Sequence, residues 1–571
     1  MAARKHPAAK LAPLLLTQEP ADGSAQLDSA QLDSAHSGDI RGGFGTIRLG
    51  DAVARRGWWP RLKTLLAILG PGLIVMVGDN DAGAFGTYTQ AGQNFGTTLL
   101  WTLLLLVPVL YVNQEMVLRL GAVTGVGHAR LILARFGRFW GAFSVLDLFI
   151  LNALTIVTEF IGLTLGFAYL GIPKLWGIIA SALIIMAVAS TGDFRRFERF
   201  ALTLVFGSLL LVPVFFLLHP DYGRVARDFF VPGYPRAAPL TEVMLLIIAI
   251  VGTTVAPWQL FFQQSYVIDK RITPRYIPYE RIDLWLGIGL VIIGGVAMMA
   301  FTSAAFEGTA QFGRFEDAGA VAVGIARRAG HVGGVLFAIA LIDACIIGAA
   351  AVSLSTAYAI GDVFGVRHSL HRNPGDAKGF YAVYFGLITI SAALVLAPGT
   401  PLGLLTNAVQ TLAGVLLPSA TVFLLLLCND RAVLGPWANT RLKNLFTGAV
   451  IAILVTLSVI LTASVLFPSI TGTQILAVLV VGSVAGVGVT LLLLARQARR
   501  PPAGAAGAPA LGPADRNDWR MPALNRLPPA RLTVLSRTWL IVLRGYLLVA
   551  GGLVLLRIAQ LISLGHGASG H

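Results

Sequence analysis

The chain has 571 residues, of which 56% are hydrophobic and 12% are charged, and its mean hydropathy is +0.75. A soluble domain is about 45–50% apolar and about 25% charged, so this composition excludes an ordinary soluble protein and indicates a membrane protein. The 43 Lys and Arg exceed the 28 Asp and Glu. With so few charges, this excess indicates basic cytoplasmic loops and argues against nucleic-acid binding. The two cysteines, Cys345 and Cys428, lie in apolar stretches, which excludes a disulfide framework and a Cys-rich metal site.

The N-terminal 60 residues are polar, and positions 24–35 contain a tandem repeat of Ser, Ala, Gln, Leu and Asp. Such a composition cannot bury enough apolar surface to offset the entropy of ordering, so we expect residues 1–60 to be a disordered tail. No early apolar stretch has the character of a signal peptide. The first apolar run is therefore expected to be a retained membrane span, with the N-terminus in the cytoplasm.

Twelve apolar segments follow, each close to the roughly 20 residues that cross a bilayer. They lie near 65–93, 97–118, 140–168, 174–190, 200–218, 242–266, 282–303, 333–359, 378–397, 402–428, 446–467 and 472–495. The loops assigned to the cytoplasm carry seventeen Lys and Arg, against seven on the other side. The positive-inside rule thus predicts a multi-pass protein of the cell membrane with this orientation.

The C-terminal part divides into three segments. Residues 431–496 hold the last two of the twelve spans, and 497–544 are basic and rich in Pro, Ala and Gly. We interpret 497–544 as a flexible cytoplasmic linker near anionic lipid. Within 545–571, residues 545–565 are apolar enough for a thirteenth span. Arg557 near its middle is costly at membrane depth, so an interfacial helix is the alternative.

Two spans combine helix breakers with polar residues. The first holds Asp79 and Asp81 among several glycines, about ten residues into the span. Unpaired charges at membrane depth are costly and mark functional sites. In the sixth, Pro257 removes a backbone N–H, so carbonyls near Thr253 lose their helical partners and become ligands for a hard cation.

Spans one and six occupy equivalent places if spans 1–5 and 6–10 are two inverted halves that share a midplane site. This arrangement predicts an all-α, LeuT-like transporter with a 5+5 inverted repeat over residues 61–430 and broken helices 1 and 6. The alternative is a pair of kinked helices in a receptor or a structural membrane protein, with the carboxylates in internal salt bridges. Two acidic residues bracketing Asn80 argue against that alternative.

Several separated blocks in this chain resemble the Nramp family of divalent metal transporters. They are Gly-Pro-Gly at 70–72, Asp-x-Gly at 81–83, and the segments 96–101, 119–125, 158–162 and 417–418. The resemblance implies a ten-helix core with two further helices, and a divalent ion as cargo with no cofactor. The chain also has no phosphate-binding loop of the G-x-x-x-x-G-K type, so we expect no enzyme activity.

The departures from the family pattern concern the metal ligands. The family's Asp-Pro-Gly-Asn aligns with 81–84, so Asp81 is kept and Ala84 replaces the amide ligand. Asp79 is an added carboxylate, either a second ligand or an acceptor in the outer shell. The family's Met-Pro-His aligns with 256–258, so Ala256 replaces the thioether ligand. Trp258 and Gln263 stand at the two histidine positions of the sixth helix, where we interpret Trp258 as filling space.

Loss of the thioether changes the expected selectivity, because sulfur favours transition metals whereas carboxylate, carbonyl and water suit Mg²⁺, Ca²⁺ and Mn²⁺. The pattern resembles the Nramp-related magnesium transporter branch, with Asp81, Asp79 and the Thr253 carbonyl as ligands. Two alternatives remain. One is a proton-coupled Mn²⁺/Fe²⁺ importer, in which the two alanines are sequence drift without functional effect. The other is a membrane metal sensor or receptor, but the tails of this chain are too short to form an output domain.

The remaining polar residues concern the coupling of transport to protons and the path by which the ion reaches the site. The family's acidic position on helix 3 aligns with Ile156, and only Glu159 remains of the helix-3 acids. Because no histidine occupies the family positions either, we expect uncoupled, voltage-driven uptake. Gln410 aligns with a family Gln that approaches the ion, or it forms an interhelical hydrogen bond. Gln263, with Gln259 and Gln264, lines a hydrophilic vestibule or joins helices.

Overall fold

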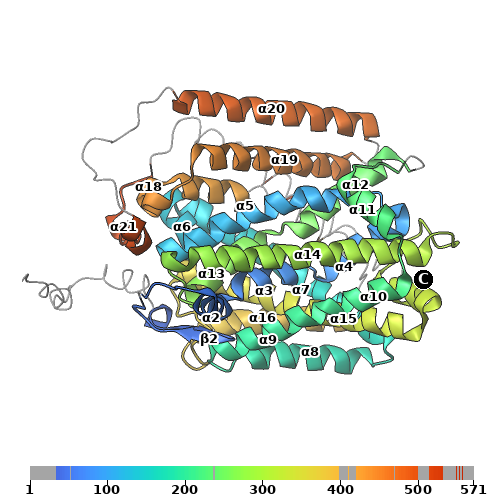
Figure 1. Ribbon diagram of the computed structural model, residues 1–571, viewed down its shortest axis with the longest axis horizontal. Helices are drawn as coiled ribbons and strands as arrows, with labels where there is room; N and C mark the ends of the chain where they lie inside the picture. Colours follow the sequence, from blue (N-terminus) through green and yellow to red (C-terminus); the bar gives the residue numbers. More distant parts are fainter. Residues whose placement is uncertain are drawn as a thin grey trace, which may run out of the picture.

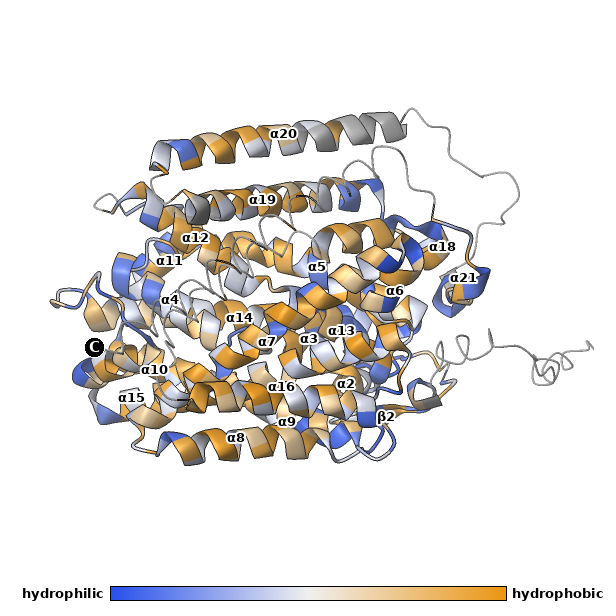
Figure 2. Ribbon diagram, turned by 180° about the vertical axis from the view of Figure 1, so that it is seen from behind, coloured by the Kyte–Doolittle hydropathy of each residue, from blue (hydrophilic) through white to orange (hydrophobic). Residues whose placement is uncertain are grey.

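The computed structural model describes residues 34–51, 53–235, 238–397, 420–467, 470–498 and 513–530, with isolated positions 409, 540, 545, 548, 552 and 556. Its long helices run nearly parallel (Figure 1). Within the described residues, eight helices are long and apolar enough to cross a membrane, or nine if one bent pair counts as a span. Figure 2 shows apolar residues along the helices and polar ones gathered around β2, α18 and α21 at one end and α11 at the other.

The first predicted span is divided into three helices, α2 (Trp58–Ile68), α3 (Pro71–Gly78) and α4 (Ala82–Phe95). Helices α2 and α3 meet at 51°, and Figure 1 shows α2 nearly end-on while the bundle helices run across the view. The predicted first span at 65–93 therefore covers the end of α2, all of α3 and most of α4, with a bend between α2 and α3. Gly70 lies at the bend with φ 154°, a conformation that residues with a side chain rarely adopt.

Four predicted spans complete the first half. They correspond to α5 (Trp101–Thr124), α7 (Arg138–Tyr169), α8 (Lys174–Ala189), and the series α9 (Phe194–Gly207), η3 (Ser208–Leu210) and α10 (Leu211–Leu218). Two short helices, α6 (His128–Phe136) and α11 (Tyr222–Phe230), lie in the connections. Helix α7 packs most extensively against α15 of the second half, so it lines the centre of the bundle.

The second half begins with the broken pair α12 (Leu240–Thr254) and α13 (Pro257–Asp269). It continues through η4 (Pro274–Tyr276), α14 (Ile277–Phe306), α15 (Ala318–Phe364) and α16 (Lys378–Leu396). Helix α15 starts fifteen residues before the predicted span at 333, and Gly330 with φ 79° kinks it there. The predicted tenth span at 402–428 lies largely outside the described residues, and so does Gln410.

Helices α19 (Arg441–Leu466) and α20 (Gly472–Ala498) lie side by side at one edge of the bundle (Figure 1), where spans eleven and twelve were predicted. They follow α18 (Arg431–Leu434) and η5 (Gly435–Trp437). The total of twelve spans stays a prediction. The thirteenth predicted span at 545–565 lies outside the described residues apart from four isolated positions.

Part of the predicted basic linker is folded onto the bundle. Residues 513–530 contain α21 (Pro513–Asp518) and η6 (Leu524–Arg526). The Trp437 indole N–H donates to the Arg516 carbonyl at 2.9 Å, and the Arg516 guanidinium lies 4.1 Å from the Trp437 ring centroid. These contacts overturn the prediction of a flexible linker for this stretch, because cation–π stacking and backbone acceptors hold it in place.

The predicted disordered tail also needs correction. Residues 34–36 form η2 (Ser34–His36), and β1 (Ile40–Gly42) pairs antiparallel with β2 (Gly45–Ile47). Ile40 and Ile47 face each other in the hairpin and are buried against the core. Their apolar pair supplies the buried surface that the preceding repeat does not have. Residues 1–33, where most of the repeat lies, are outside the described part of the chain.

A buried ion pair joins this hairpin to the first helix. Lys270 Nζ donates to Glu198 Oε1 at 2.7 Å and to the carbonyls of Ile68 and Leu69, at the C-terminal end of α2, at 2.6 and 2.9 Å. The other oxygen of Glu198 accepts the Gly43 N–H of the hairpin at 2.5 Å. The side chains of Lys270 and Glu198 are both fully buried. The pair therefore fixes the α2–α3 bend to α9 and α13.

Replacing Lys270 with methionine is expected to destabilise the protein. It leaves the Glu198 carboxylate buried without its counter-charge, and breaking such a pair costs about 3–5 kcal/mol. The measurement is the apparent melting temperature of the purified protein in detergent, with Lys63→Met on the exposed side of α2 as the control. Adding Glu198→Gln to Lys270→Met should recover part of the loss. Equal melting temperatures for Lys270→Met and Lys63→Met would contradict a stabilising role.

Candidate metal transport site

The break in the first helix places two carboxylates at a helix N-terminus. Asp79, Asn80 and Asp81 connect α3 to α4, and all three side chains are buried. Asp81 is the N-cap of α4, and its Oδ1 accepts the Ala84 N–H at 2.9 Å. The positive end of the α4 dipole stabilises this anion and fixes its direction. Asn80 points instead to α14, where its amide lies 3.4 Å from the Val291 carbonyl.

The break in the sixth helix supplies carbonyl oxygens. Helix α12 ends at Thr254 and α13 starts at Pro257, with the non-helical Val255 and the extended Ala256 between them. The helical partner of the Thr253 carbonyl would be the nitrogen of Pro257, which has no hydrogen. The sequence-based interpretation of a Thr253 carbonyl released by Pro257 therefore agrees with the backbone found here.

Direct contacts join the two breaks. Gln259 on α13 donates from Nε2 to Asp79 Oδ1 and accepts from Gln114 Nε2 on α5 at 2.9 Å. The Tyr88 hydroxyl on α4 lies 2.6 Å from the Thr254 hydroxyl on α12. Asp79 Oδ2 is buried and has no hydrogen-bond partner among the described residues. Gln259 is thus part of the site rather than of an outer vestibule.

Glu159 on α7 reaches the same break. Its Oε2 accepts the Ala82 N–H, the first of α4, at 3.2 Å, so this carboxyl lies at the same helix N-terminus that Asp81 caps. Gly348 on α15 permits this approach, because a Cβ there would lie 2.9 Å from Glu159 Oε2 and 3.2 Å from the Asp81 Cβ.

The other predicted residues lie as follows. Ala84 is fully buried one turn into α4, and Ala256 is half-buried at the sixth-helix break. Trp258 is buried, and a Cβ on Gly78 would lie 3.5 Å from its ring, which agrees with a space-filling role. Gln263 is fully buried, and neither polar atom of its amide has a hydrogen-bond partner in the described structure. The inverted halves thus bring together the first-helix carboxylates, Glu159 and the sixth-helix break.

One histidine that sequence reasoning did not single out bonds to α13. His128 Nδ1 lies 2.9 Å from Gln264 Oε1, and Gln264 donates to the Val126 carbonyl at 2.7 Å. Gln264 therefore ties α13 to α6 and does not line a vestibule. Burial lowers the pKa of His128 to about 4, so this imidazole is neutral at pH 7. It is a structural hydrogen-bond partner rather than a proton carrier.

The residues of the two breaks themselves, 79–81 and 253–256, offer carboxylate, amide and carbonyl oxygens as metal ligands. In the described part of the chain, no three His, Cys, Asp or Glu side chains cluster closely enough to hold a metal by themselves. An ion at the breaks would therefore need backbone carbonyls or water besides Asp81 and Asp79. This mixture of carboxylate, carbonyl and water suits hard divalent cations.

Comparison with known proteins decides the family. The family model described as natural resistance-associated macrophage protein-like, Nramp, matches residues 72–464. The chain belongs to the Nramp family. The "Divalent metal cation transporter MntH" of Ralstonia nicotianae is 30% identical over 412 residues, which are 69% of this chain and 90% of that protein. The protein of the same name from Latilactobacillus sakei is 31% identical over 278 residues, 46% of this chain and 58% of that protein.

Solved structures show the same fold. Two variant forms of the Eremococcus coleocola manganese transporter superpose on this Nramp protein with a TM-score of 0.59 each, at 19% and 20% identity. They cover 80% and 78% of this chain, and each is itself covered to 98%. The LeuT-like fold and the family resemblance predicted from the sequence are confirmed. Nramp proteins are transporters, so the prediction that this chain is not an enzyme is also confirmed.

Proposed function

We propose that this Nramp protein imports Mg²⁺ and Mn²⁺ across the cell membrane without stoichiometric proton flux. That its cargo is a divalent metal follows from the family, which also disfavours the alternative of a metal sensor. The choice of Mg²⁺ rests on one observation. The two helix breaks present carboxylate and carbonyl oxygens as ligands. Ala84 and Ala256 occupy positions at which a soft or bulky side chain would make a hard, hydrated ion fit less well. The ion is cargo, and we propose no cofactor.

The proposed orientation places the N-terminus in the cytoplasm. The loop 270–276, the connection 189–194 and the hairpin at 40–47 lie at the same end of the bundle as α2. Arg195, Arg199 and Arg271 at this end contact the hairpin or η2. Basic residues of this kind favour the cytoplasmic side of a membrane.

The absence of proton coupling is supported by what surrounds Glu159. Ile156, one turn earlier on α7, is buried and apolar, so it cannot pass a proton onward. The membrane potential alone supplies about 2.3 kcal/mol per charge per 100 mV, hence about 4.6 kcal/mol for a divalent ion. Since about 1.4 kcal/mol is a factor of ten, this supports accumulation of roughly a thousandfold. Import needs no proton gradient.

The second candidate function is a proton-coupled Mn²⁺/Fe²⁺ importer. The position of Glu159 beside Asp81 favours it, because two buried carboxyls at one helix N-terminus can share a proton, which a cation that binds Asp81 would displace. The sequence did not reveal this proximity. In the proposed uncoupled mechanism, the displaced proton stays on Glu159 and returns to the pair when the ion leaves.

Proteoliposomes loaded with a pH dye distinguish the two candidates. We expect a negative internal potential to drive Mg²⁺ and Mn²⁺ uptake, without metal-dependent acidification and at a rate unaffected by a pH gradient. Asp81→Ala vesicles are the control for leak. Acidification that depends on metal and is absent with Asp81→Ala would establish the coupled importer. Mn²⁺ uptake without any Mg²⁺ uptake would contradict the proposed substrate.

A further inference from the structure

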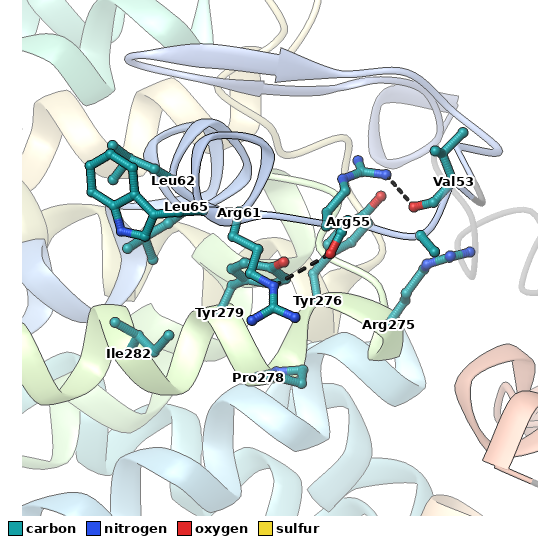
Figure 3. Close-up of a pocket in the computed structure, with 12 residues that line it drawn as sticks. Val53, Arg55, Arg61, Leu62, Leu65, Arg275, Tyr276, Pro278, Tyr279 and Ile282 are labelled. Carbon is teal, nitrogen blue, oxygen red and sulfur yellow. Dashed lines mark hydrogen bonds between the residues drawn. The ribbon is translucent and has the colours of Figure 1, made fainter.

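A cavity of about 500 Å³ lies between α2 and the start of α14, away from the metal site (Figure 3). The segment 53–55 before α2 closes one side, and η4 with the first turns of α14 forms the other. The cavity lies beside the α2–α3 bend, at the end of the bundle where α2 crosses the direction of the other helices (Figure 1).

The two ends of this cavity differ in chemistry. Figure 3 shows Leu62, Leu65 and Ile282 at one end, and the guanidinium groups of Arg55 and Arg275 toward the other. Arg61 lies between them, and none of the described residues that line the cavity is acidic. The nearby carboxylate of Asp51 is engaged by Arg55 at 2.7 and 2.9 Å. The cavity therefore complements an anion joined to an apolar chain.

Arg61 is a cation of this cavity with N–H donors to spare. Its Nε donates weakly to the Arg55 carbonyl at 3.4 Å, and no carboxylate of the described residues lies within ion-pair distance of it. A guanidinium presents five N–H donors in a planar fork that matches two phosphate oxygens. A phosphate at this position would receive the remaining donors of Arg61.

The surroundings place the cavity at a membrane–water boundary. Trp58 and Trp59 at the start of α2 are each 66% exposed, and Trp residues concentrate at that boundary. Helix α14 continues from Ile282, which lines the cavity, to Leu286 beyond it, and both side chains are 46% exposed and suit contact with lipid chains. An amphiphile can thus hold its headgroup at the arginines while its chain follows α14 into the bilayer.

We propose that this cavity is a binding site for one anionic phospholipid. The phosphodiester accepts hydrogen bonds from Arg61 and Arg275, and one acyl chain covers Leu62 and Ile282. A zwitterionic lipid would bring its ammonium group to the same cluster of arginines and bind less tightly. Because α2 leads directly into the α2–α3 bend, the bound lipid links the first broken helix to α14 at the bilayer surface.

Native mass spectrometry of the purified full-length protein tests the headgroup end. With phosphatidylglycerol as the probe, we expect wild type to retain one lipid that phosphatidylcholine does not replace. Arg61→Gln with Arg275→Gln should weaken retention by about tenfold, since each arginine near a lipid surface contributes to anion binding. Arg56→Gln is the matched control, because Arg56 is exposed next to the cavity but does not line it. Equal retention by the double variant and by Arg56→Gln would overturn the proposal.

The apolar end is tested with Ile282→Trp, which should fill the cavity and reduce retention of phosphatidylglycerol. Ile184→Trp is its control, since Ile184 on α8 is the same residue type with the same 46% exposure but lies on a helix that does not line the cavity. Glycerol phosphate, the headgroup chemistry without a chain, should not displace the lipid at equal concentration. Displacement by glycerol phosphate, or equal loss of lipid with both tryptophan variants, would show that the site does not recognise a lipid.

Discussion

Replacing Asp81 with alanine is expected to abolish divalent metal transport. A divalent ion that leaves water in mid-membrane needs a fixed anionic ligand, because attraction at an effective dielectric of about 20 amounts to several kcal/mol at contact. Losing even about 1.4 kcal/mol of that attraction lowers affinity tenfold. Asp81 is held for this role by the Ala84 N–H and the N-terminal dipole of α4. We expect uptake of Mg²⁺ and Mn²⁺ below about a tenth of wild type, measured as initial rates in proteoliposomes.

Two further variants separate the effect of the carboxylate charge on transport from its effect on the stability of the protein. Asp81→Asn keeps an oxygen that can accept the Ala84 N–H but removes the charge, so its transport should be lost as in Asp81→Ala while its melting temperature stays nearer wild type. Asp79→Ala should be milder, because one oxygen of Asp79 is already engaged by Gln259. Wild-type flux in Asp81→Asn would mean that the charge at residue 81 does not bind the ion.

Restoring the two family ligands together, Ala256→Met and Ala84→Asn, is expected to reverse the metal preference. The thioether favours softer ions such as Cd²⁺ and Mn²⁺, and both larger side chains take the space that a hydrated Mg²⁺ needs. Ala256 has the extended backbone of the break and Ala84 is fully buried beside Asp81, so both additions point at the same site. Mg²⁺ uptake should fall by about tenfold or more relative to Cd²⁺ uptake, as a difference of about 1.4 kcal/mol in binding would give.

The measurement is competition of Mg²⁺, Mn²⁺ and Cd²⁺ for uptake by the double variant. Ala249→Met is the matched control, since Ala249 is also half-buried on the same span but lies two turns before the break. Each single variant shows which ligand matters more. An unchanged ratio of Mg²⁺ to Cd²⁺ uptake, in a protein that melts like wild type, would place selectivity outside these two positions.

Much of the site could be predicted because it depends on local backbone chemistry. Pro257 has no amide hydrogen wherever the chain folds, so the sixth helix breaks there and the Thr253 carbonyl loses its helical donor. Asp81 precedes a helix start, where an N-cap carboxylate is stable. Hydropathy located the spans, since any helix in hydrocarbon must be apolar over about 20 residues. These features belong to short segments and need no knowledge of their neighbours.

The contacts that complete the site depend on packing between distant segments. Glu159 lies beside Asp81, 78 residues away in sequence, only because Gly348 on a third helix leaves room for both. Gln259 reaches Asp79 across 180 residues, although its spacing on α13 fitted a vestibule equally well. Likewise, a hairpin next to a low-complexity repeat is ordered by the burial of two isoleucines. A hydrogen bond to the buried Lys270–Glu198 pair then holds this hairpin against the bundle. Each of these contacting residues is polar or small, and the sequence around it does not indicate which way its side chain points. Only the tertiary structure therefore decided which carboxyls share the site.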